Sequence, residues 1–295
     1  MKNIKSRVYD YIINIPNKLF FPLFKKNKKI NHVFRKFGFI HHKQVLENKN
    51  FAREIHEGLK NLNLKKIIKK EIKIKQTRYI THLNKHLDKK IKIKIKNFFD
   101  NPEKIYQISS MLGCRVKFRK YILQVNFYNN KTIESEGAKM FHRDSDSLQD
   151  QVKIFMLIND IDDHNGMFYF IPKTLIDEDY RLPYESDRMS MELINKWRNY
   201  DKTILSYLKN KNKKYSAIKK LYGIQGEILY IDTGKLYHKG GYISDPNKKR
   251  ILLQVIYTPI LGLSNWADNQ DNLLLKFLQH KLTSLKIKLR TKIKI

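Results

Sequence analysis

The stretch from residue 51 to residue 64 carries apolar residues at helical intervals. Phe51, Ile55, Leu59 and Leu62 fall on one face of a helix, and two glutamates, at positions 54 and 57, occupy the other side. A helix that is apolar on one side is stabilised by packing that side against a core. The spacing therefore predicts an amphipathic helix over these residues.

A second helix is predicted by the residues at its two ends. Asp100 or Asn101 is placed to cap the first turn, Pro102 follows, and Gly113 comes directly after Leu112. Proline suits the first turn because its missing N–H would be unpaired there, and glycine readily adopts the left-handed conformation that ends a helix. We expect this helix to run from about residue 101 to Leu112.

Two lysine-rich stretches alternate between polar and apolar residues, namely residues 71–75 and 90–96. Strict alternation is typical of a half-buried or edge strand, with the isoleucines on one face and the lysines in solvent. Both stretches are therefore predicted to be strands. The lysines would serve either as a solvated face or as a track for a polyanion, and the sequence leaves both interpretations open.

From Arg115 onward the dominant period becomes two. Turn residues such as Asn129-Asn130, Glu136-Gly137 and Asn165-Gly166 separate short runs rich in β-branched and aromatic residues. Many short strands at this spacing predict a sandwich or jelly roll, so the fold class is mainly β with flanking helices (α+β). The predicted strands are residues 115–118, 121–128, 139–143, 153–159, 167–171, 227–232 and 250–258.

The remaining segments divide the chain into one catalytic-size domain with terminal additions. Residues 1–50 are predicted to be a basic and aromatic N-terminal extension, residues 51–262 the domain, and residues 263–295 a basic C-terminal helix and tail. Residues 175–222 are polar with a helical pattern and are predicted to be an insertion between strands. Such an insertion either contributes to substrate specificity or only covers one face of a sheet.

Composition adds a large positive charge to this picture. The 295 residues contain 60 Lys and Arg against 28 Asp and Glu, a formal net charge of +32. This charge favours anionic partners, but the abundance of Lys, Ile and Asn along the whole chain is also what A·T-rich codons would produce. We expect no specific nucleic-acid partner, because a recognition groove would need clustered arginines and stacking aromatics.

A single cysteine, Cys114, excludes an intramolecular disulfide and a cysteine-based zinc site, which makes a reducing, cytoplasmic setting the default expectation. No apolar run approaches the roughly 20 residues of a membrane-spanning helix. The aromatic and basic N-terminal segment leaves peripheral contact with an anionic membrane open. The oligomeric state is not indicated by the sequence.

The candidate chemistry begins at His142 and Asp144. On a strand, residues two apart project from the same face, so this imidazole and carboxylate can converge on one point. His238 would supply a third ligand, and two histidines with one carboxylate form the facial set that holds non-haem Fe(II) and leaves positions open for O2. A His-x-Asp pair alone is common in solvated loops, and Asp146 is a competing carboxylate if the strand continues.

Four features in order extend this set. They are a strand bearing Gln124 and Asn126; the His142–Asp144 motif; an acidic turn at Asn165-Gly166 followed by Ile171-Pro172-Lys173-Thr174; and a Gly226-Glu227 strand leading to His238 and then Arg250. Between residues 121 and 258 this order resembles the phytanoyl-CoA dioxygenase family of Fe(II)- and 2-oxoglutarate-dependent oxygenases. The resemblance implies a double-stranded β-helix, that is, a cupin-like jelly-roll core.

The resemblance also implies roles for individual residues. His142, Asp144 and His238 would ligate the iron, and Arg250 would bind the distal carboxylate of 2-oxoglutarate with its guanidinium fork. Asn126 and Gln124 fall where family members place amides that contact this co-substrate. The implied reaction converts 2-oxoglutarate and O2 to succinate and CO2 and hydroxylates a C–H bond, and the presence of Asp144 argues against halogenation.

Some features depart from the family pattern. Lys173-Thr174 replaces the usual Gly-Ser, and Gly240 stands where some members have a serine that touches the co-substrate. His164 in the acidic turn is interpreted as a solvated loop residue. The expected substrate is a small molecule or a lipid- or glycan-linked metabolite. The alternatives are a non-catalytic jelly-roll binding protein, a nucleic-acid demethylase of the same chemistry, and a metal-dependent hydrolase.

Overall fold

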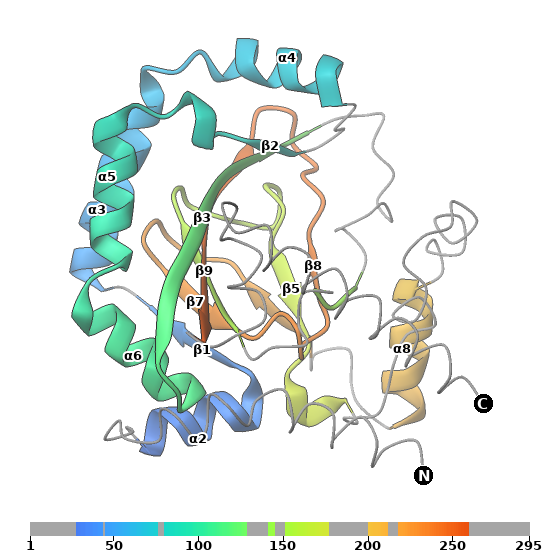
Figure 1. Cartoon of the computed structure of the whole chain (residues 1–295). Helices are drawn as coiled ribbons and strands as arrows, with labels where there is room; N and C mark the ends of the chain where they lie inside the picture. The colour runs from blue at the N-terminus through green and yellow to red at the C-terminus, as the bar shows by residue number, and fades with distance from the viewer. Residues whose placement is uncertain are drawn as a thin grey trace, which may run out of the picture.

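The computed structural model describes residues 28–43, 45–75, 80–128, 141–144, 151–176, 200–211 and 218–259. Its centre is a pair of antiparallel sheets (Figure 1). The larger sheet has the order β1-β7-β4-β9-β3-β2 and the smaller has the order β6-β5-β8. The strands of the larger sheet are β1 (Phe39–His42), β2 (Ile80–His82), β3 (Val116–Phe127), β4 (Val152–Leu157), β7 (Ile228–Ile231) and β9 (Lys249–Pro259); those of the smaller are β5 (Phe168–Phe170), β6 (Lys219–Leu221) and β8 (His238–Gly240).

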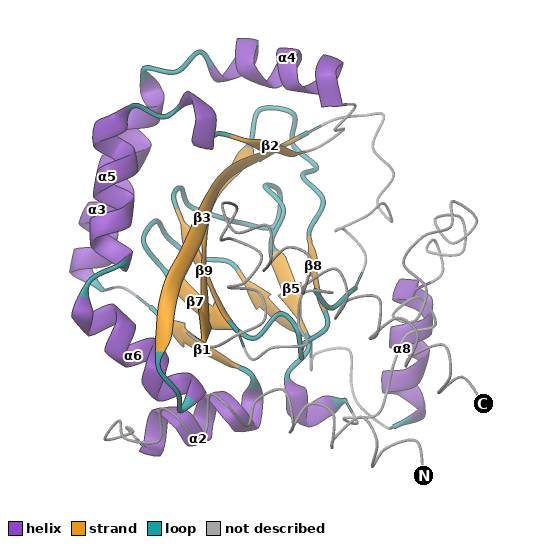
Figure 2. Cartoon of the chain, in the orientation of Figure 1, coloured by secondary structure: helices purple, strands orange, loops and turns teal. Residues whose placement is uncertain are grey.

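Helices cover one face of the larger sheet. Figure 2 shows α3, α5 and α6 on one side of this sheet and strands β5 and β8 of the smaller sheet on the other. The helices are α2 (Lys28–Phe37), α3 (Leu46–Lys60), α4 (Leu64–Lys75), α5 (Lys89–Phe99), α6 (Pro102–Leu112) and α8 (Tyr200–Asn210). Among the described residues, no helix combines the length and the apolar character that crossing a membrane requires.

Alternation along the strands creates two separate apolar layers. On β9, Leu253 and Val255 pack with residues of α3, α5 and α6, including Ile55 and Phe99. The neighbouring residue Leu252 faces the other way and joins the cluster between the two sheets, with residues of β4, β5 and β7. The period of two thus separates a helix-covered core from an interior face enclosed by the two sheets.

The two lysine-rich alternations are helical, so their prediction as strands was wrong. Within α5, Ile91 and Ile95 lie four residues apart and Phe99 follows after another four, which places all three on the buried face of a helix, while Ile93 remains 49% exposed. A spacing of four satisfies both periods, because it is two strand repeats and about one helical turn. Asp88 favours the helix, because its side chain caps the first turn by accepting a hydrogen bond from the Ile91 N–H.

Part of the predicted N-terminal extension belongs to the main sheet. Strand β1 pairs with β7, with Phe39 opposite Ile231 and His42 opposite Ile228. The preceding helix α2 contacts α6, where the Asn31 amide donates to the carbonyl oxygens of Ser110 and Met111. Residues 28–42 are therefore a structural part of the fold rather than an addition to it.

The other elements agree more closely with the sequence. Helix α6 begins after the Asn101 cap and ends at Gly113, whose φ of +70° is left-handed. The two strands predicted over 115–128 form one strand, β3, with an irregularity between Phe118 and Lys120. The predicted insertion contains α8 but ends in β6, which pairs with β5. Residues 263–295, Met140 and Asp146 lie outside the described residues.

Candidate metal centre

Two of the predicted ligand residues are joined directly through their backbones. His142 and His238 form an isolated antiparallel bridge, in which each N–H donates to the other residue's carbonyl oxygen, at 3.0 and 2.9 Å. The Asp144 N–H donates to the carbonyl oxygen of Thr233 at 2.9 Å, which secures the third residue. Two chain segments almost a hundred residues apart in sequence are thus held side by side.

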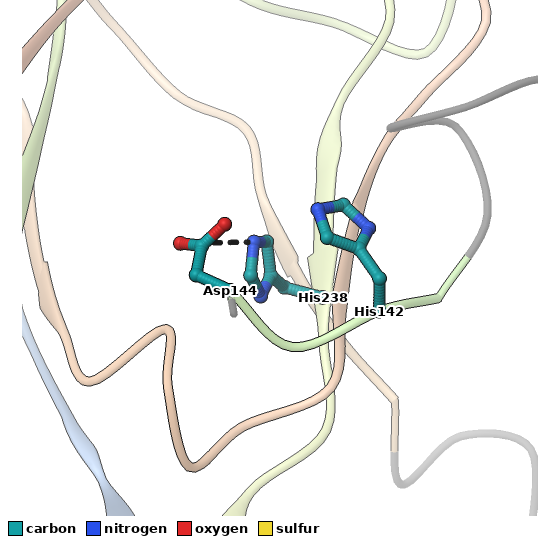
Figure 3. A group of neighbouring side chains, drawn as sticks. All are labelled: His142, Asp144 and His238. Carbon is teal, nitrogen blue, oxygen red and sulfur yellow. Dashed lines mark ion pairs between the residues drawn. The ribbon is translucent and has the colours of Figure 1, made fainter. Parts of the chain in front are cut away.

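The three side chains converge at one point (Figure 3). One potential ligand atom from each of His142, Asp144 and His238 lies within 4.8 Å of the others. The His238 Nε2 atom lies 3.8 Å from Asp144 Oδ2, and the two imidazole centroids are 4.4 Å apart. Among the residues that the structure describes, His142, Asp144 and His238 are thus close enough together to hold a metal ion.

The His238 ring is oriented for ligation. Its Nδ1 lies 3.1 Å from the carbonyl oxygen of Leu236, and because a carbonyl can only accept, Nδ1 carries the proton and Nε2 offers its lone pair. Burial lowers the pKa of His238 to about 3, with His142 acting in the same direction. The imidazole is therefore neutral at physiological pH, the form that binds metals.

Asp144 is held in its ionised form. Burial would raise its pKa, but His238, Lys153 and His142 together hold the pKa well below its usual range. Lys153 is ion-paired with this carboxylate, and its Nζ lies 2.5 Å from Asp144 Oδ2. A set of two histidines and one carboxylate is the donor set that suits a divalent non-haem iron, so the chemistry of these three residues fits that metal.

The predicted co-substrate residues form a second polar group on the interior face. Asn126 of β3 and Arg250 of β9 are opposite each other in the register, and Gln124 lies two residues from Asn126 on the same face. The exposed fractions of Gln124, Asn126 and Arg250 are 5%, 4% and 4%. The structure therefore buries all three together between the sheets.

Hydrogen bonds connect this second group. The Gln124 amide donates to Asn126 Oδ1 at 3.3 Å, and Arg250 Nε lies 3.4 Å from the same oxygen. Arg250 Nη1 also donates to the carbonyl oxygens of Gly166 and Met167, the latter at 3.1 Å. Gly166 has a φ of +80°, and a Cβ there would lie 2.8 Å from the Gly241 carbonyl oxygen, so only glycine fits this turn.

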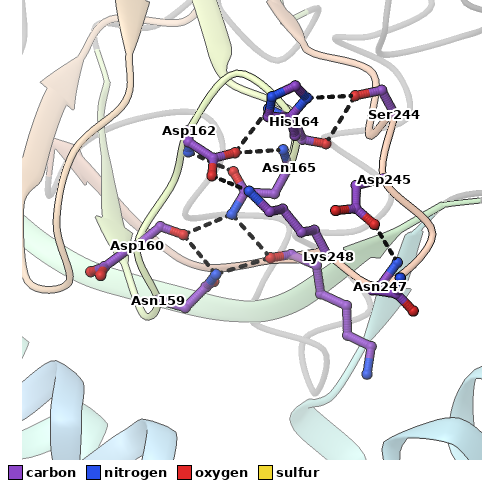
Figure 4. A network of polar contacts seen from close by, with 10 residues as sticks. Asn159, Asp160, Asp162, His164, Asn165, Ser244, Asp245, Asn247 and Lys248 are labelled. Carbon is purple, nitrogen blue, oxygen red and sulfur yellow. Dashed lines mark hydrogen bonds and ion pairs between the residues drawn. The ribbon is translucent and has the colours of Figure 1, made fainter.

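The acidic turn that precedes Gly166 is a hydrogen-bonded loop (Figure 4). Asp162 Oδ1 accepts from the N–H groups of His164 and Asn165, and Asn165 Oδ1 accepts from the Asp162 N–H. Lys248, which directly precedes β9, forms an ion pair with Asp162 and so connects the turn to that strand. His164 is exposed in this turn, in agreement with its interpretation as a loop residue, and the network fixes the carbonyls that Arg250 contacts.

Two polar residues of the interior were not predicted. Lys153 contacts Asp144, and the Gln254 amide donates to Gln124 Oε1 at 2.8 Å. Each stands between two apolar residues of its strand, Lys153 between Val152 and Ile154 and Gln254 between Leu253 and Val255. A polar residue inside a buried strand requires a partner, and this is the signal that would have identified both.

Comparison with known proteins supports the fold through structure alone. No family model matches the chain, and no curated protein sequence matches it. The solved structure of the epimerase SnoN in complex with Fe3+, alpha ketoglutarate and nogalamycin RO matches with a TM-score of 0.50 and 10% identity, over 78% of this chain and 82% of that one. HygX from Streptomyces hygroscopicus, with nickel, 2-oxoglutarate and hygromycin B bound, has a TM-score of 0.49 and 11% identity, over 79% and 88% of the two chains. The likeness to SnoN confirms the predicted jelly-roll fold.

Proposed function

We propose that this protein is an Fe(II)- and 2-oxoglutarate-dependent dioxygenase related to the phytanoyl-CoA dioxygenase family. It hydroxylates a C–H bond of a small molecule or of a lipid- or glycan-linked metabolite. The observation that carries the proposal is the convergence of His142, Asp144 and His238 at one point of a jelly roll whose interior also buries Arg250. SnoN, which shares the fold, was solved with iron and the same 2-oxo acid.

His142, Asp144 and His238 would hold the iron through two imidazole nitrogens and one carboxylate oxygen. Bound in this way, Fe(II) supplies the activation of O2 that C–H hydroxylation requires. The protein contributes a neutral His238 ring, fixed by its bond to Leu236, and an ionised Asp144. Both ligands are therefore in the protonation state that metal binding needs.

Arg250 would bind the distal carboxylate of 2-oxoglutarate. Its guanidinium is buried, and a planar fork of donors can bind a carboxylate bidentately. The amides of Asn126 and Gln124 lie beside it and would orient the co-substrate by hydrogen bonds. In the overall reaction, one O2 oxygen enters the substrate C–H bond as hydroxyl and the other enters succinate, while 2-oxoglutarate loses CO2.

The test is succinate release measured with Fe(II), 2-oxoglutarate, O2 and a panel of metabolites. We expect a basal release that rises with a true substrate and stops when Fe(II) or O2 is omitted. Anaerobic titration with Fe(II) should show one binding site. Protein that binds no Fe(II) would refute the metal centre, and product formation without O2 or 2-oxoglutarate would indicate a hydrolase. Iron binding without succinate formation across the panel would favour a non-catalytic binding protein.

A further inference from the structure

Lys153 is the one lysine of β4, and it points to the interior face of the larger sheet. Its neighbours Val152 and Ile154 belong to the helix-covered core, so the alternation of the strand turns Lys153 toward the smaller sheet. In the register it lies opposite Ile231 on one side and Ile256 on the other. Its side chain is only 12% exposed, and a lysine this enclosed is uncommon without a paired anion.

The anion that Lys153 contacts is a predicted metal ligand. Its Nζ lies 2.5 Å from Asp144 Oδ2, and this same oxygen is the one that lies 3.8 Å from His238 Nε2. The oxygen that faces the imidazole is therefore already bonded to an ammonium group. A divalent ion held by Asp144 and His238 would sit close to this positive charge.

We propose that Lys153 is a built-in cation of the metal centre, which weakens metal binding and makes it depend on the dianionic co-substrate. A divalent metal, Asp144 and Lys153 together carry two net positive charges at a mostly buried site, where the side chains of Lys153 and Asp144 are 12% and 23% exposed. Two like charges a few ångströms apart repel strongly when water is excluded, whereas 2-oxoglutarate brings two negative charges that offset them. Metal and co-substrate should therefore bind cooperatively.

If Lys153 instead oriented Asp144 for metal binding, its removal would change the metal affinity in the opposite direction. If its main effect were to hold the Asp144 carboxylate in place, its removal would weaken metal binding, because groups that orient a ligand typically contribute about 10- to 100-fold to metal affinity. If its charge dominates, its removal tightens metal binding. Measuring the sign of the change thus decides between repulsion and orientation.

The experiment compares Mn(II) affinity, by anaerobic calorimetry on the full chain, with and without 2-oxoglutarate. In the absence of 2-oxoglutarate, we expect Lys153→Met to bind Mn(II) at least about tenfold more tightly than the parent. Addition of 2-oxoglutarate should then increase the Mn(II) affinity of Lys153→Met by a smaller factor than it increases that of the parent. Lys153→Arg keeps the charge and should bind like the parent. Lys239→Met is the matched control, since Lys239 follows His238 on β8 but lies over the rings of Phe141 and Tyr169.

This inference rests on the metal centre of the proposed function, and an Asp144→Ala variant separates the two. If Asp144→Ala binds Mn(II) as the parent does, the metal centre itself is wrong. If Asp144→Ala loses binding while Lys153→Met binds Mn(II) equally or more weakly, only the role of Lys153 is refuted. Thermal unfolding of each variant shows whether it is folded, and Lys153→Gln removes the same charge and carries the same expectation if Lys153→Met is unstable.

Discussion

The two faces of the larger sheet use the same strands for different purposes. Toward the helices, β9 presents Leu253 and Val255 to a continuous apolar core. Toward the smaller sheet, the same strand presents Arg250 and Gln254, which hydrogen bond to amides of β3. One residue step along the backbone therefore separates a position that stabilises the fold from a position that faces the site.

This difference shows how the protein encloses charge without losing its core. Apolar burial on the helix side supplies stability, at about 25 cal/mol per Å² of apolar surface. On the interior side, burying polar and charged groups costs free energy, and each of these groups has a partner, such as Asp144 for Lys153 and the Gly166 carbonyl for Arg250. Substitutions on the two faces should therefore separate stability from activity.

The largest effect is expected for Asp144→Ala on the interior face. Loss of a residue that only orients a metal ligand typically costs about 10- to 100-fold. Removing the ligand itself should therefore lower succinate release by more than about a hundredfold. The variant also leaves the Lys153 ammonium without its carboxylate, so it should unfold at a lower urea concentration. Adding Lys153→Met should recover stability but not activity. Succinate release by Asp144→Ala at the parent rate would contradict the proposed centre.

Leu253→Ala on the helix face should show the opposite profile. Leu253 is fully buried, and deleting a buried leucine side chain typically lowers the free energy of unfolding by about 2–5 kcal/mol. The metal affinity of the folded protein should stay at the parent value, because Leu253 points away from the site. Urea unfolding and Mn(II) titration measure the two quantities. Weaker metal binding with unchanged stability would show that the two faces are not independent.

Arg250→Lys keeps the charge on the interior face but removes the guanidinium fork. Lysine cannot reproduce a bidentate carboxylate contact together with the bonds to Gly166 and Met167. We expect the KM for 2-oxoglutarate to rise by about tenfold or more. Fe(II) affinity in the absence of 2-oxoglutarate serves as the control and should change little. An unchanged KM would place the co-substrate elsewhere in the interior.

The sequence predicted helices and strands correctly where the capping residues or the alternation of polar and apolar residues allowed one interpretation. Helix α6 follows its signals closely, because Asn101, Pro102 and Gly113 act through local backbone chemistry. Helix α5 was misread because its isoleucines satisfy two periods, and the capping role of Asp88 was the discriminating local signal. Local chemistry is readable from sequence, whereas a degenerate spacing is resolved only by what the element packs against.

The candidate site was predicted to a similar extent. The three candidate metal ligands and Arg250 came from an ordered motif, and the structure brings the three candidates together. Lys153 and Gln254 were missed because no motif contains them, and their partners, Asp144 and Gln124, lie 9 and 130 residues away in sequence. Such pairings depend on the register between strands, which the sequence does not specify by itself.

The metal-free protein should lose stability as the pH falls below about 6.5. The folded-state pKa of His238 is lowered to about 3, so between these values the unfolded chain binds a proton that the folded chain does not. The free energy of unfolding should therefore decrease by roughly 1 kcal/mol per pH unit from this residue. Burial lowers the pKa of His41 and His42 as well, and these add to the same slope.

A His238→Gln variant isolates this contribution. Glutamine has no proton to bind, so the decrease in stability between pH 6.5 and 5 should be smaller than in the parent. Asp144 does not interfere in this window, because its lowered pKa keeps the carboxylate ionised and its own contribution is lost only below about pH 4. Equal slopes for parent and variant, measured by urea unfolding, would show that His238 is not held neutral.

The smallest effect is expected for Gln254→Met, which removes one hydrogen bond from the interior face. Gln254 donates to Gln124 Oε1, and this bond fixes which way the Gln124 amide points toward Asn126. A neutral hydrogen bond contributes about 0.5–1.5 kcal/mol, so the KM for 2-oxoglutarate should rise only severalfold while Mn(II) affinity is unchanged. Gln124→Met should produce the same rise, and the double variant should add little, because both changes break one chain of hydrogen bonds. Fully additive effects would show that the two amides act separately, and that the polar side of the sheet is a set of independent contacts rather than one connected network.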